Sequence, residues 1–186
     1  GVNIGKNKDT PLERAAEDYL FCLERVHALA SYITINLSSP NTKGLRDLQA
    51  ADTTRHLVTA LQGERETLAA KQGGRHVPIA IKIAPDLSDE HITALAEVFS
   101  QTKMDGVIAT NTTIGRTGVE GHRNAAEAGG LPGRPVFALS TDVLRKQYYQ
   151  TVMVIQPIDI LPDGRQNMCD GCPDVTVHDG RLVWSC

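Results

Sequence analysis

Apolar residues in the first three quarters of the chain follow two alternating patterns, and each pattern predicts a different kind of element. Short apolar runs rich in Ile and Val predict strands. These expected strands cover residues 2–4, 32–37, 77–84 and 106–110. Between them, apolar residues recur every three or four positions, which predicts amphipathic helices. These expected helices cover residues 11–30 and 50–71, a segment that follows Ser88, and a segment from Ser140 to about Gln147.

Several helix ends carry capping signals. The segment Thr10–Glu13 has the pattern of a capping box with Pro at the first helical position. Ser88 is expected to cap the helix that follows it, and Gly73–Gly74 is expected to end the helix at 50–71. The strand at 77–84 is apolar throughout instead of alternating, which predicts a parallel strand covered on both faces.

Strand and helix alternate four times along the main part of the chain. This rhythm is typical of βαβ units and a parallel sheet, so the predicted fold class is α/β. The rhythm does not distinguish an open sheet from a barrel. A complete (β/α)8 barrel typically needs about 250 residues. With 186 residues, this chain could form only an incomplete one.

The tail from Val152 to Cys186 breaks this rhythm. Residues 152–160 are apolar and are expected to be extended. Residues 175–184 predict a β-hairpin around Asp179–Gly180. We therefore expect two parts, an α/β part at 1–148 and a short β-rich tail at 152–186.

Composition and charge exclude several classes of protein. Hydrophobic residues make up 41% of the chain and charged residues 22%, which is typical of a soluble globular protein. The net charge of -3 and the lack of a basic run argue against a nucleic-acid partner. No apolar stretch approaches the ~20 residues that span a bilayer. The chain begins at a motif and without Met, so we expect a fragment of something longer.

The most informative stretch runs from Ile33 to Arg46 and reads ITINLSSPNTKGLR. Its apolar strand leads directly into short polar side chains, and Pro40 restricts its own φ and the conformation of Ser39. Polar groups at the carboxyl end of a parallel strand are where (β/α) folds place their chemistry. The alternative is an ordinary polar loop between a strand and a helix.

Lys82 lies inside the apolar run VPIAIKIAP. An unpaired ammonium is very costly to bury, so this side chain needs either a partner or a function. One explanation is a structural salt bridge. The other is a cation that faces an electron-rich cofactor. The residues alone leave both explanations open.

Five segments, in order and at compatible spacing, resemble class 2 dihydroorotate dehydrogenases, the quinone-linked flavoenzymes of pyrimidine biosynthesis. They read GVNIGKN, NLSSPNTKGLR, VPIAIKIAPDL, DGVIATNTT and GGLPGRP. The resemblance extends from Gly1 to about Tyr148, and the tail from Val152 does not share it. It implies about half of a (β/α)8 TIM barrel, joined near residues 148–152 to an unrelated segment.

The resemblance also implies an activity: FMN-dependent oxidation of (S)-dihydroorotate to orotate, with quinone as acceptor, in de novo synthesis of UMP. Ser39 matches the catalytic base of the family, and Thr42 is expected to relay its proton because Ser alone is a poor base. The positions that match flavin-binding residues are Asn3, Asn36, Lys82, Thr110 and Gly133. The positions that match substrate-binding residues are Asn36, Asn41, Asn111 and Thr112.

The physical roles of these matched residues follow from their chemistry. Asn amides offer both donors and acceptors to a planar ring of alternating C=O and N–H groups. By the resemblance, the charge of Lys82 lies near the flavin N1 and O2 edge and stabilises the reduced ring. Gly133 is expected to permit a close approach of the backbone to the flavin.

The same resemblance implies that parts of the enzyme are missing from this chain. The family carries phosphate-binding glycines after the position of Gln147, and a phosphate without its backbone N–H groups binds weakly. We therefore expect weak FMN binding and little turnover by this chain alone. The family reaches the membrane surface through a helical hairpin upstream of the position of Gly1. The parent enzyme is thus expected on the bacterial inner membrane, and this fragment in the cytoplasm.

A second hypothesis is that the chain is not an enzyme, but a non-enzymatic fragment or a small metal-binding protein that uses the cysteines of the tail. Cys169, Cys172 and Cys186 form the pattern C-x2-C-x13-C, and the first pair has the spacing of metal ligands. His178 or Asp170 would have to complete a zinc or iron–sulfur site. The alternative is free thiols, or a loose disulfide in an edge hairpin.

Overall fold

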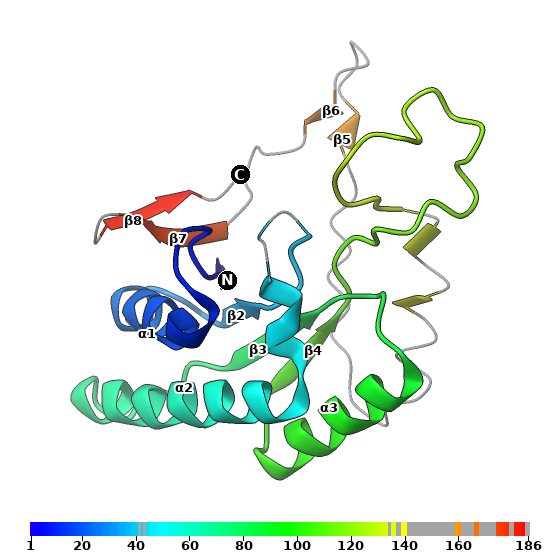
Figure 1. Ribbon diagram of the computed structural model, residues 1–186. Coiled ribbons are helices and arrows are strands. Elements are labelled where there is room, and N and C mark those ends of the chain that lie inside the picture. Colours follow the sequence, from blue (N-terminus) through cyan, green and yellow to red (C-terminus); the bar gives the residue numbers. More distant parts are fainter. Residues whose placement is uncertain are drawn as a thin grey trace.

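The computed structural model describes residues 1–40, 42, 44–133, 135–136 and 139–140, and the backbone of four short strands in the tail. Strands and helices alternate along the main part of the chain, as the sequence predicts (Figure 1). With η for a 3-10 helix, these elements are β1 (Val2–Ile4), η1 (Leu12–Arg14), α1 (Ala15–Val26), β2 (Ile33–Asn36), η2 (Leu45–Gln49), α2 (Ala51–Lys71), β3 (Ile79–Ile83), α3 (Asp89–Gln101) and β4 (Gly106–Ala109). The tail strands are β5 (Asp159–Ile160), β6 (Gln166–Asn167), β7 (Asp174–His178) and β8 (Arg181–Trp184).

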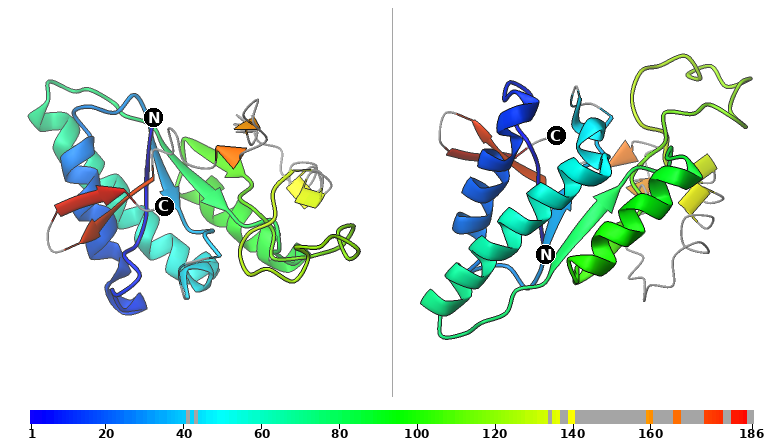
Figure 2. Two further views of the ribbon diagram at one scale, coloured as in Figure 1. Left: turned by 90° about the horizontal axis from the view of Figure 1, so that it is seen from above. Right: turned by 60° about the horizontal axis from the view of Figure 1, so that its bottom comes forward.

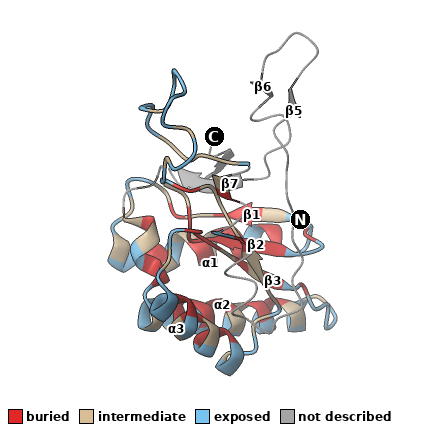
Figure 3. Ribbon diagram, turned by 90° about the vertical axis from the view of Figure 1, so that its right-hand side faces the viewer, coloured by how far each residue is buried: buried red, intermediate tan, exposed pale blue. Residues whose placement is uncertain are grey.

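The first four strands form a parallel sheet in the spatial order β4-β3-β2-β1. Each strand is the neighbour of the one before it in the sequence, and a helix separates the two. This is the arrangement of consecutive βα units in a (β/α)8 barrel. The helices α1, α2 and α3 all lie on one side of the sheet (Figures 1 and 3). The main part therefore forms an incomplete barrel, as predicted.

The two faces of this sheet differ in chemistry. The Ile residues of β2 and β3 are at most 1% exposed and share one core with the buried stripes of the three helices (Figure 3). On the opposite face, Asn36 is aligned with Lys82, and Thr34 is aligned with Ala80. Because side chains alternate between faces along a strand, these residues lie together on the side without helices. In a complete barrel, that side is the interior.

The strand β3 is less uniformly buried than its apolar sequence predicts. Its three Ile residues are buried, whereas Ala80 and Lys82 are only half-buried. The expectation that both faces of this strand are covered is therefore wrong for the face that carries Lys82. The reason is that helices pack against only one face of the sheet.

Two of the predicted helix ends are confirmed. Ser88 caps α3, and its hydroxyl oxygen accepts a hydrogen bond from the His91 N–H at 3.3 Å. The helix α2 ends before Gly73 and Gly74, whose φ values of 70° and 83° lie in the left-handed region that favours glycine.

The predicted capping box at Thr10–Glu13 does not form. The chain enters α1 through the 3-10 turn η1, whose N-terminal cap is Pro11 and makes no side-chain hydrogen bond. The Lys6 ammonium instead donates to the Thr10 carbonyl at 2.6 Å. The approach to this helix is thus held by a side chain from the preceding loop, which a local capping pattern does not reveal.

The predicted hairpin of the tail is confirmed. The strands β7 and β8 pair in antiparallel register, with Val175 opposite Trp184 and His178 opposite Arg181. The strand β7 also runs parallel to β1 and extends the main sheet, a pairing that the sequence pattern did not predict (Figure 2). The helix expected from Ser140 falls almost entirely outside the described residues.

Among the helices that the structure describes, none combines sufficient length with sufficient apolar character to cross a bilayer.

Candidate active site at the carboxyl edge of the sheet

Asn36 is the last residue of β2 and lies on the polar face of the sheet. It is 8% exposed, and its Oδ1 accepts hydrogen bonds from the Ser38 N–H at 3.0 Å and from Ser38 Oγ at 2.9 Å. Behind it, the Tyr19 hydroxyl of α1 donates to the Asn36 carbonyl at 2.7 Å. Burial raises the pKa of Tyr19 far above its usual range, so its hydroxyl remains a donor. Asn36 is therefore held at both its backbone and its side chain.

Ser38 connects the loop after β2 with the loop after β4. It is 0% exposed, and its Oγ accepts a hydrogen bond from Asn111 Nδ2 at 3.0 Å while it donates to Asn36. Asn111 Oδ1 in turn accepts a hydrogen bond from the Thr112 N–H at 2.8 Å. Two of the predicted asparagines thus meet through one hydroxyl. Sequence reasoning did not assign Ser38 a role, although it stands inside the NLSSPN motif.

Arg46 joins the loops that follow three consecutive strands. Its Nε donates to the Ser38 carbonyl at 3.2 Å, and its Nη2 donates to the Thr112 carbonyl at 3.1 Å. Its Nη1 donates to Oδ2 of Asp86, in the loop after β3, at 2.7 Å. Asp86 also accepts a hydrogen bond from the Thr113 hydroxyl. Both members of this pair lie in matched segments, NLSSPNTKGLR and VPIAIKIAPDL, but sequence reasoning missed them.

Lys82 lies beside Asn36 on the adjacent strand and on the same face. It is half-buried, and its ammonium makes no hydrogen bond or ion pair with the part of the chain that the structure describes. The salt-bridge explanation therefore finds no support there. An ammonium in this position suits an anion or an electron-rich ring.

The segment after β4 brings further predicted residues to this edge. Thr110 Oγ1 donates to the Asn111 carbonyl at 3.1 Å and lies 2.8 Å from Ser140 Oγ. Gly130 packs directly against Thr112, because a Cβ added at Gly130 would lie 1.9 Å from Thr112 Oγ1. Only a glycine at this position lets the backbone around Gly130 lie against the loop after β4.

Gly133 is explained by its backbone conformation. Its φ of 79° lies in the left-handed region, which favours glycine, and a Cβ there would meet no atom of the described residues within 4 Å. Within the described part of the chain, the backbone conformation and not crowding therefore requires a glycine here. The expected close approach of this residue to a flavin stays a prediction.

Ser39 and Thr42 lie in the loop that follows β2, and both are half-buried. Ser39 directly follows Ser38 and so lies at the edge where Asn36 and Asn111 meet. Asn41 lies outside the described residues, and its expected contact with substrate is untested. The roles expected for Ser39 as base and Thr42 as relay likewise stay predictions.

The loop that follows β1, the strand of the predicted Asn3, carries a buried lysine, Lys6. Asn3 is 7% exposed and is aligned with Thr34 on the polar face. Lys6 donates from its ammonium to the carbonyls of Asn7 at 2.7 Å and Thr10 at 2.6 Å. Burial lowers the pKa of Lys6. Its two carbonyl partners make Lys6 an anchor for the loop after β1.

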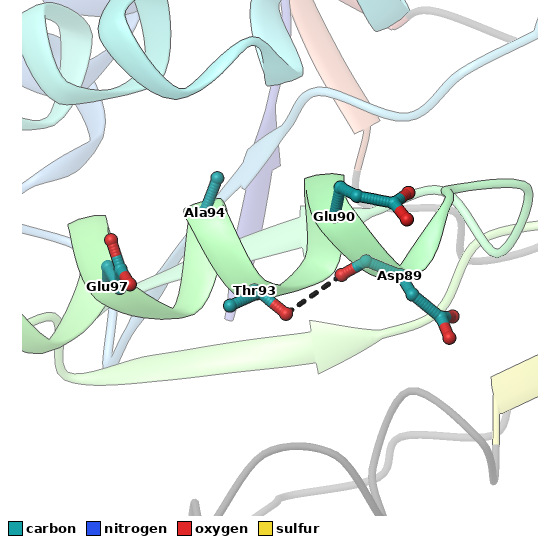
Figure 4. Close-up of a pocket in the computed structure, with 5 residues that line it drawn as sticks. All are labelled: Asp89, Glu90, Thr93, Ala94 and Glu97. Atoms are coloured by element: carbon teal, nitrogen blue, oxygen red, sulfur yellow. Dashed lines mark hydrogen bonds between the residues drawn. The ribbon is translucent and has the colours of Figure 1, made fainter.

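A shallow hollow of about 410 Å³ lies elsewhere, along α3 (Figure 4). Its lining consists of Asp89, Glu90, Thr93, Ala94 and Glu97. Three carboxylates at its surface disfavour anionic ligands. The hollow contains none of the predicted site residues and is not part of the candidate site.

The metal hypothesis for the tail remains untested. Among the described residues, no group of three or more His, Cys, Asp or Glu could hold a metal ion. Cys169, Cys172 and Cys186 lie outside those residues. The metal site therefore stays a prediction.

The family model for dihydroorotate dehydrogenase matches residues 1–160. This chain belongs to the dihydroorotate dehydrogenase family. Dihydroorotate dehydrogenase (quinone) of Flavobacterium lutescens is 60% identical over 146 residues, which cover 78% of this chain and 41% of that protein. The enzyme of the same name from Vibrio parahaemolyticus is 48% identical over 187 aligned positions, which cover 98% of this chain and 55% of that protein.

A solved structure confirms the fold of this chain. The dihydroorotate dehydrogenase (DHODH) of Eimeria tenella, solved as a crystal structure in complex with ferulenol, has 44% sequence identity to this chain. The two structures superpose with a TM-score of 0.74. The match covers 80% of this chain and 42% of that one. The chain thus spans about half the length of the curated relatives it matches. The prediction of a partial TIM barrel is confirmed.

The expected division near residue 148 stays a prediction. The family model extends to residue 160. The alignment with the Flavobacterium lutescens protein covers 78% of the chain, whereas the one with the Vibrio parahaemolyticus protein covers 98% at lower identity. These matches differ in how much of the tail they include.

Proposed function

We propose that this chain carries part of the active site that oxidises (S)-dihydroorotate to orotate in pyrimidine biosynthesis. FMN is the proposed cofactor and a quinone the proposed electron acceptor. The observation that carries this proposal is the meeting of Asn36, Asn111 and Lys82 at the carboxyl edge of the sheet. Barrel enzymes place their chemistry at this edge. Membership of the dihydroorotate dehydrogenase family over residues 1–160 supports the proposal.

The donors at this edge fit the polar rim of a flavin. The Lys82 ammonium and Asn36 Nδ2 lie on adjacent strands, and neither donates to any of the residues that the structure describes. Such a pair suits a ring edge that carries a carbonyl oxygen and gains negative charge on reduction. FMN, when bound, would supply the acceptor for hydride from C6 of dihydroorotate and pass electrons to quinone. The residues proposed to hold it are Asn3, Asn36, Lys82, Thr110 and Gly133.

The substrate is proposed to bind at the same edge. Dihydroorotate carries ring carbonyls, ring N–H groups and a carboxylate, which amide side chains can bind through both donors and acceptors. Asn36 and Asn111 are already held in place by Ser38, so little rotamer freedom is lost when they bind a ligand. The residues proposed to bind the substrate are Asn36, Asn41, Asn111 and Thr112.

Ser39 is proposed to move the proton. Its Oγ takes the proton from C5 of dihydroorotate and passes its own proton to Thr42 Oγ1, which in turn passes one to water. Ser39 therefore ends the step neutral. A serine hydroxyl is a weak base, so a second hydroxyl or a water must accept its proton. Pro40 restricts the backbone conformation of Ser39, which helps to keep the Ser39 hydroxyl in position during this proton transfer.

Titration of the purified chain with FMN tests the proposal. Flavin fluorescence should change in a saturable way, and dihydroorotate added without oxygen should bleach the flavin absorbance band. Ser39→Ala should bind FMN equally well but bleach at least about a hundredfold more slowly, because a positioned base contributes that much. A chain that is folded by circular dichroism but shows no saturable change up to about 1 mM FMN would overturn the proposed function for this chain.

A further inference from the structure

We propose that Ser38 is a positioning residue whose hydroxyl determines which atoms of Asn36 and Asn111 remain available to a ligand. The identity of that ligand rests on the proposed function. The positioning itself rests only on the hydrogen bonds of this chain. Ser38 is 0% exposed and lies between the two asparagines, so its hydroxyl acts through them.

The direction of each hydrogen bond follows from the donors and acceptors involved. Asn111 Nδ2 can only donate, so its 3.0 Å bond to Ser38 Oγ uses the hydroxyl as the acceptor. The single hydroxyl proton of Ser38 is then directed to Asn36 Oδ1, 2.9 Å away. The chain of bonds therefore runs in one direction, from Asn111 through Ser38 to Asn36.

Backbone N–H groups determine the orientation of both amides. The Ser38 N–H donates to Asn36 Oδ1 at 3.0 Å, and the Thr112 N–H donates to Asn111 Oδ1 at 2.8 Å. In a reversed amide, an NH2 group would face a backbone N–H at each of these places. Both orientations thus follow from the bonding pattern.

The consequence is a site that offers mainly donors. Asn36 Oδ1 already accepts two hydrogen bonds, which leaves the two N–H groups of Nδ2 for a ligand. Asn111 keeps one N–H on Nδ2. The Lys82 ammonium, aligned with Asn36 on the next strand, adds further donors. Through Ser38, this edge selects ligands with carbonyl or carboxylate oxygens, and orotate is such a ligand.

NMR of the 15N-labelled chain tests the positioning without any ligand. S38A should shift the side-chain NH2 signals of both Asn36 and Asn111. It should also speed the exchange of the Asn111 proton that binds Ser38 by about fivefold, the effect of losing one ordinary hydrogen bond. The matched control is S100A, since Ser100 is exposed on α3. Signals of Asn36 and Asn111 that stay unchanged in S38A would overturn the proposal.

Titration with orotate measures the consequence for binding. S38A should weaken the affinity for orotate by about 5- to 30-fold, and S100A should leave it unchanged. N36D keeps an acceptor for Ser38 but replaces the outward donor by a carboxylate oxygen, so it should weaken binding by about a hundredfold or more. Wild-type affinity in a folded S38A would overturn the positioning role.

The two proposals fail in different ways. If the wild-type chain binds no orotate, the proposed function fails for this chain, and the NMR signals alone decide whether Ser38 orients the amides. If S38A does not fold, S38C provides a second variant, because a thiol has a similar volume but is a weak donor and acceptor. Both asparagine signals must then move in S38C, and unchanged signals would overturn the proposal.

Discussion

The Arg46 guanidinium donates a hydrogen bond to Asp86 Oδ2 at 2.7 Å, although 40 positions separate the two residues in the sequence. The pair joins η2, which follows β2, to the loop after β3. The remaining bonds of Arg46 reach the carbonyls of Ser38 and Thr112, so the loop after β4 is included. An active site assembled from separate loops depends on such connections, because small displacements of catalytic groups cost much rate.

Replacing Arg46 by Lys should loosen these loops. A lysine ammonium cannot reproduce the planar set of donors that reaches three partners at once. We expect the free energy of unfolding to fall by about 1–3 kcal/mol and the affinity for orotate to fall with it. Urea unfolding and orotate titration measure the two effects. The control is Arg14→Lys. Both side chains of the Arg14–Glu17 ion pair are exposed, so this substitution should leave the free energy of unfolding and the affinity for orotate unchanged. Equal effects of both substitutions would contradict the connecting role.

Replacing Lys82 by Met should weaken cofactor binding without lowering stability. The substitution removes a half-buried ammonium that has no partner among the described residues, so the free energy of unfolding should stay constant or rise. FMN affinity should fall by about 10- to 100-fold, because a charge-assisted hydrogen bond is lost. Fluorescence titration and urea unfolding provide the two measurements. Lys71→Met at the exposed end of α2 is the matched control, and unchanged FMN affinity in the Lys82 variant would exclude the flavin role.

Replacing Asp105 by Asn should affect stability alone. Asp105 lies at the amino-terminal edge of the sheet, where it accepts hydrogen bonds from the Arg65 guanidinium and, at 2.8 Å, from the Ile79 N–H. We expect the free energy of unfolding to fall by about 2–4 kcal/mol, since Arg65 is left nearly buried without its charged partner. In the folded variant, FMN and orotate should bind as in the wild type, because this edge lies opposite the one that carries the proposed site. A loss of binding at constant stability would contradict this separation of roles.

Cys22 should be protected from alkylation for as long as the chain is folded. It is a free thiol, 0% exposed, and burial raises its pKa from 9.0 to about 12. We expect iodoacetamide at about pH 8 to modify it at least a hundredfold more slowly than in urea, as measured by mass spectrometry of the peptide that contains it. Rapid modification of the folded chain would show that this part of the core opens easily.

The same thiol predicts a pH dependence of stability. The raised pKa means that the folded state favours the protonated thiol. The contribution of Cys22 to the free energy of unfolding is therefore fully present below about pH 9 and is lost as the pH rises towards about 12. The free energy of unfolding of Cys22→Ala should therefore fall less over this interval than that of the wild type. Parallel falls in the two proteins would contradict the assigned cause.

Elements of the main part could be predicted from the sequence because their signals are local. The Ile-rich run in β3 and the repeat of apolar residues in α3 each require only neighbours along the chain, and both predictions were confirmed. The capping box at Thr10–Glu13 was wrong because Lys6 holds that segment from outside the helix. The pairing of β7 with β1 was missed for a similar reason, since strand partners are not encoded in the pattern of either strand.

Within the candidate site, the sequence pointed to some of the residues that the structure brings together, but to none of their connections. Asn36 and Asn111 were expected from their motifs, and the structure brings them together. Ser38 and Arg46 stood in the same motifs without an assigned role. Their importance depends on partners in other loops, which no local pattern names.

By itself, the sequence determined the order of strands and helices, the membership of a family and the set of polar residues at the strand ends. These follow from periodicity and from motifs, which are read from consecutive residues. Only the tertiary structure decided that Lys82 faces the same side as Asn36 and that Ser38 links Asn36 to Asn111. The physical reason is that these relationships depend on strand register and on hydrogen bonds between distant loops, which exist only once the sheet has formed.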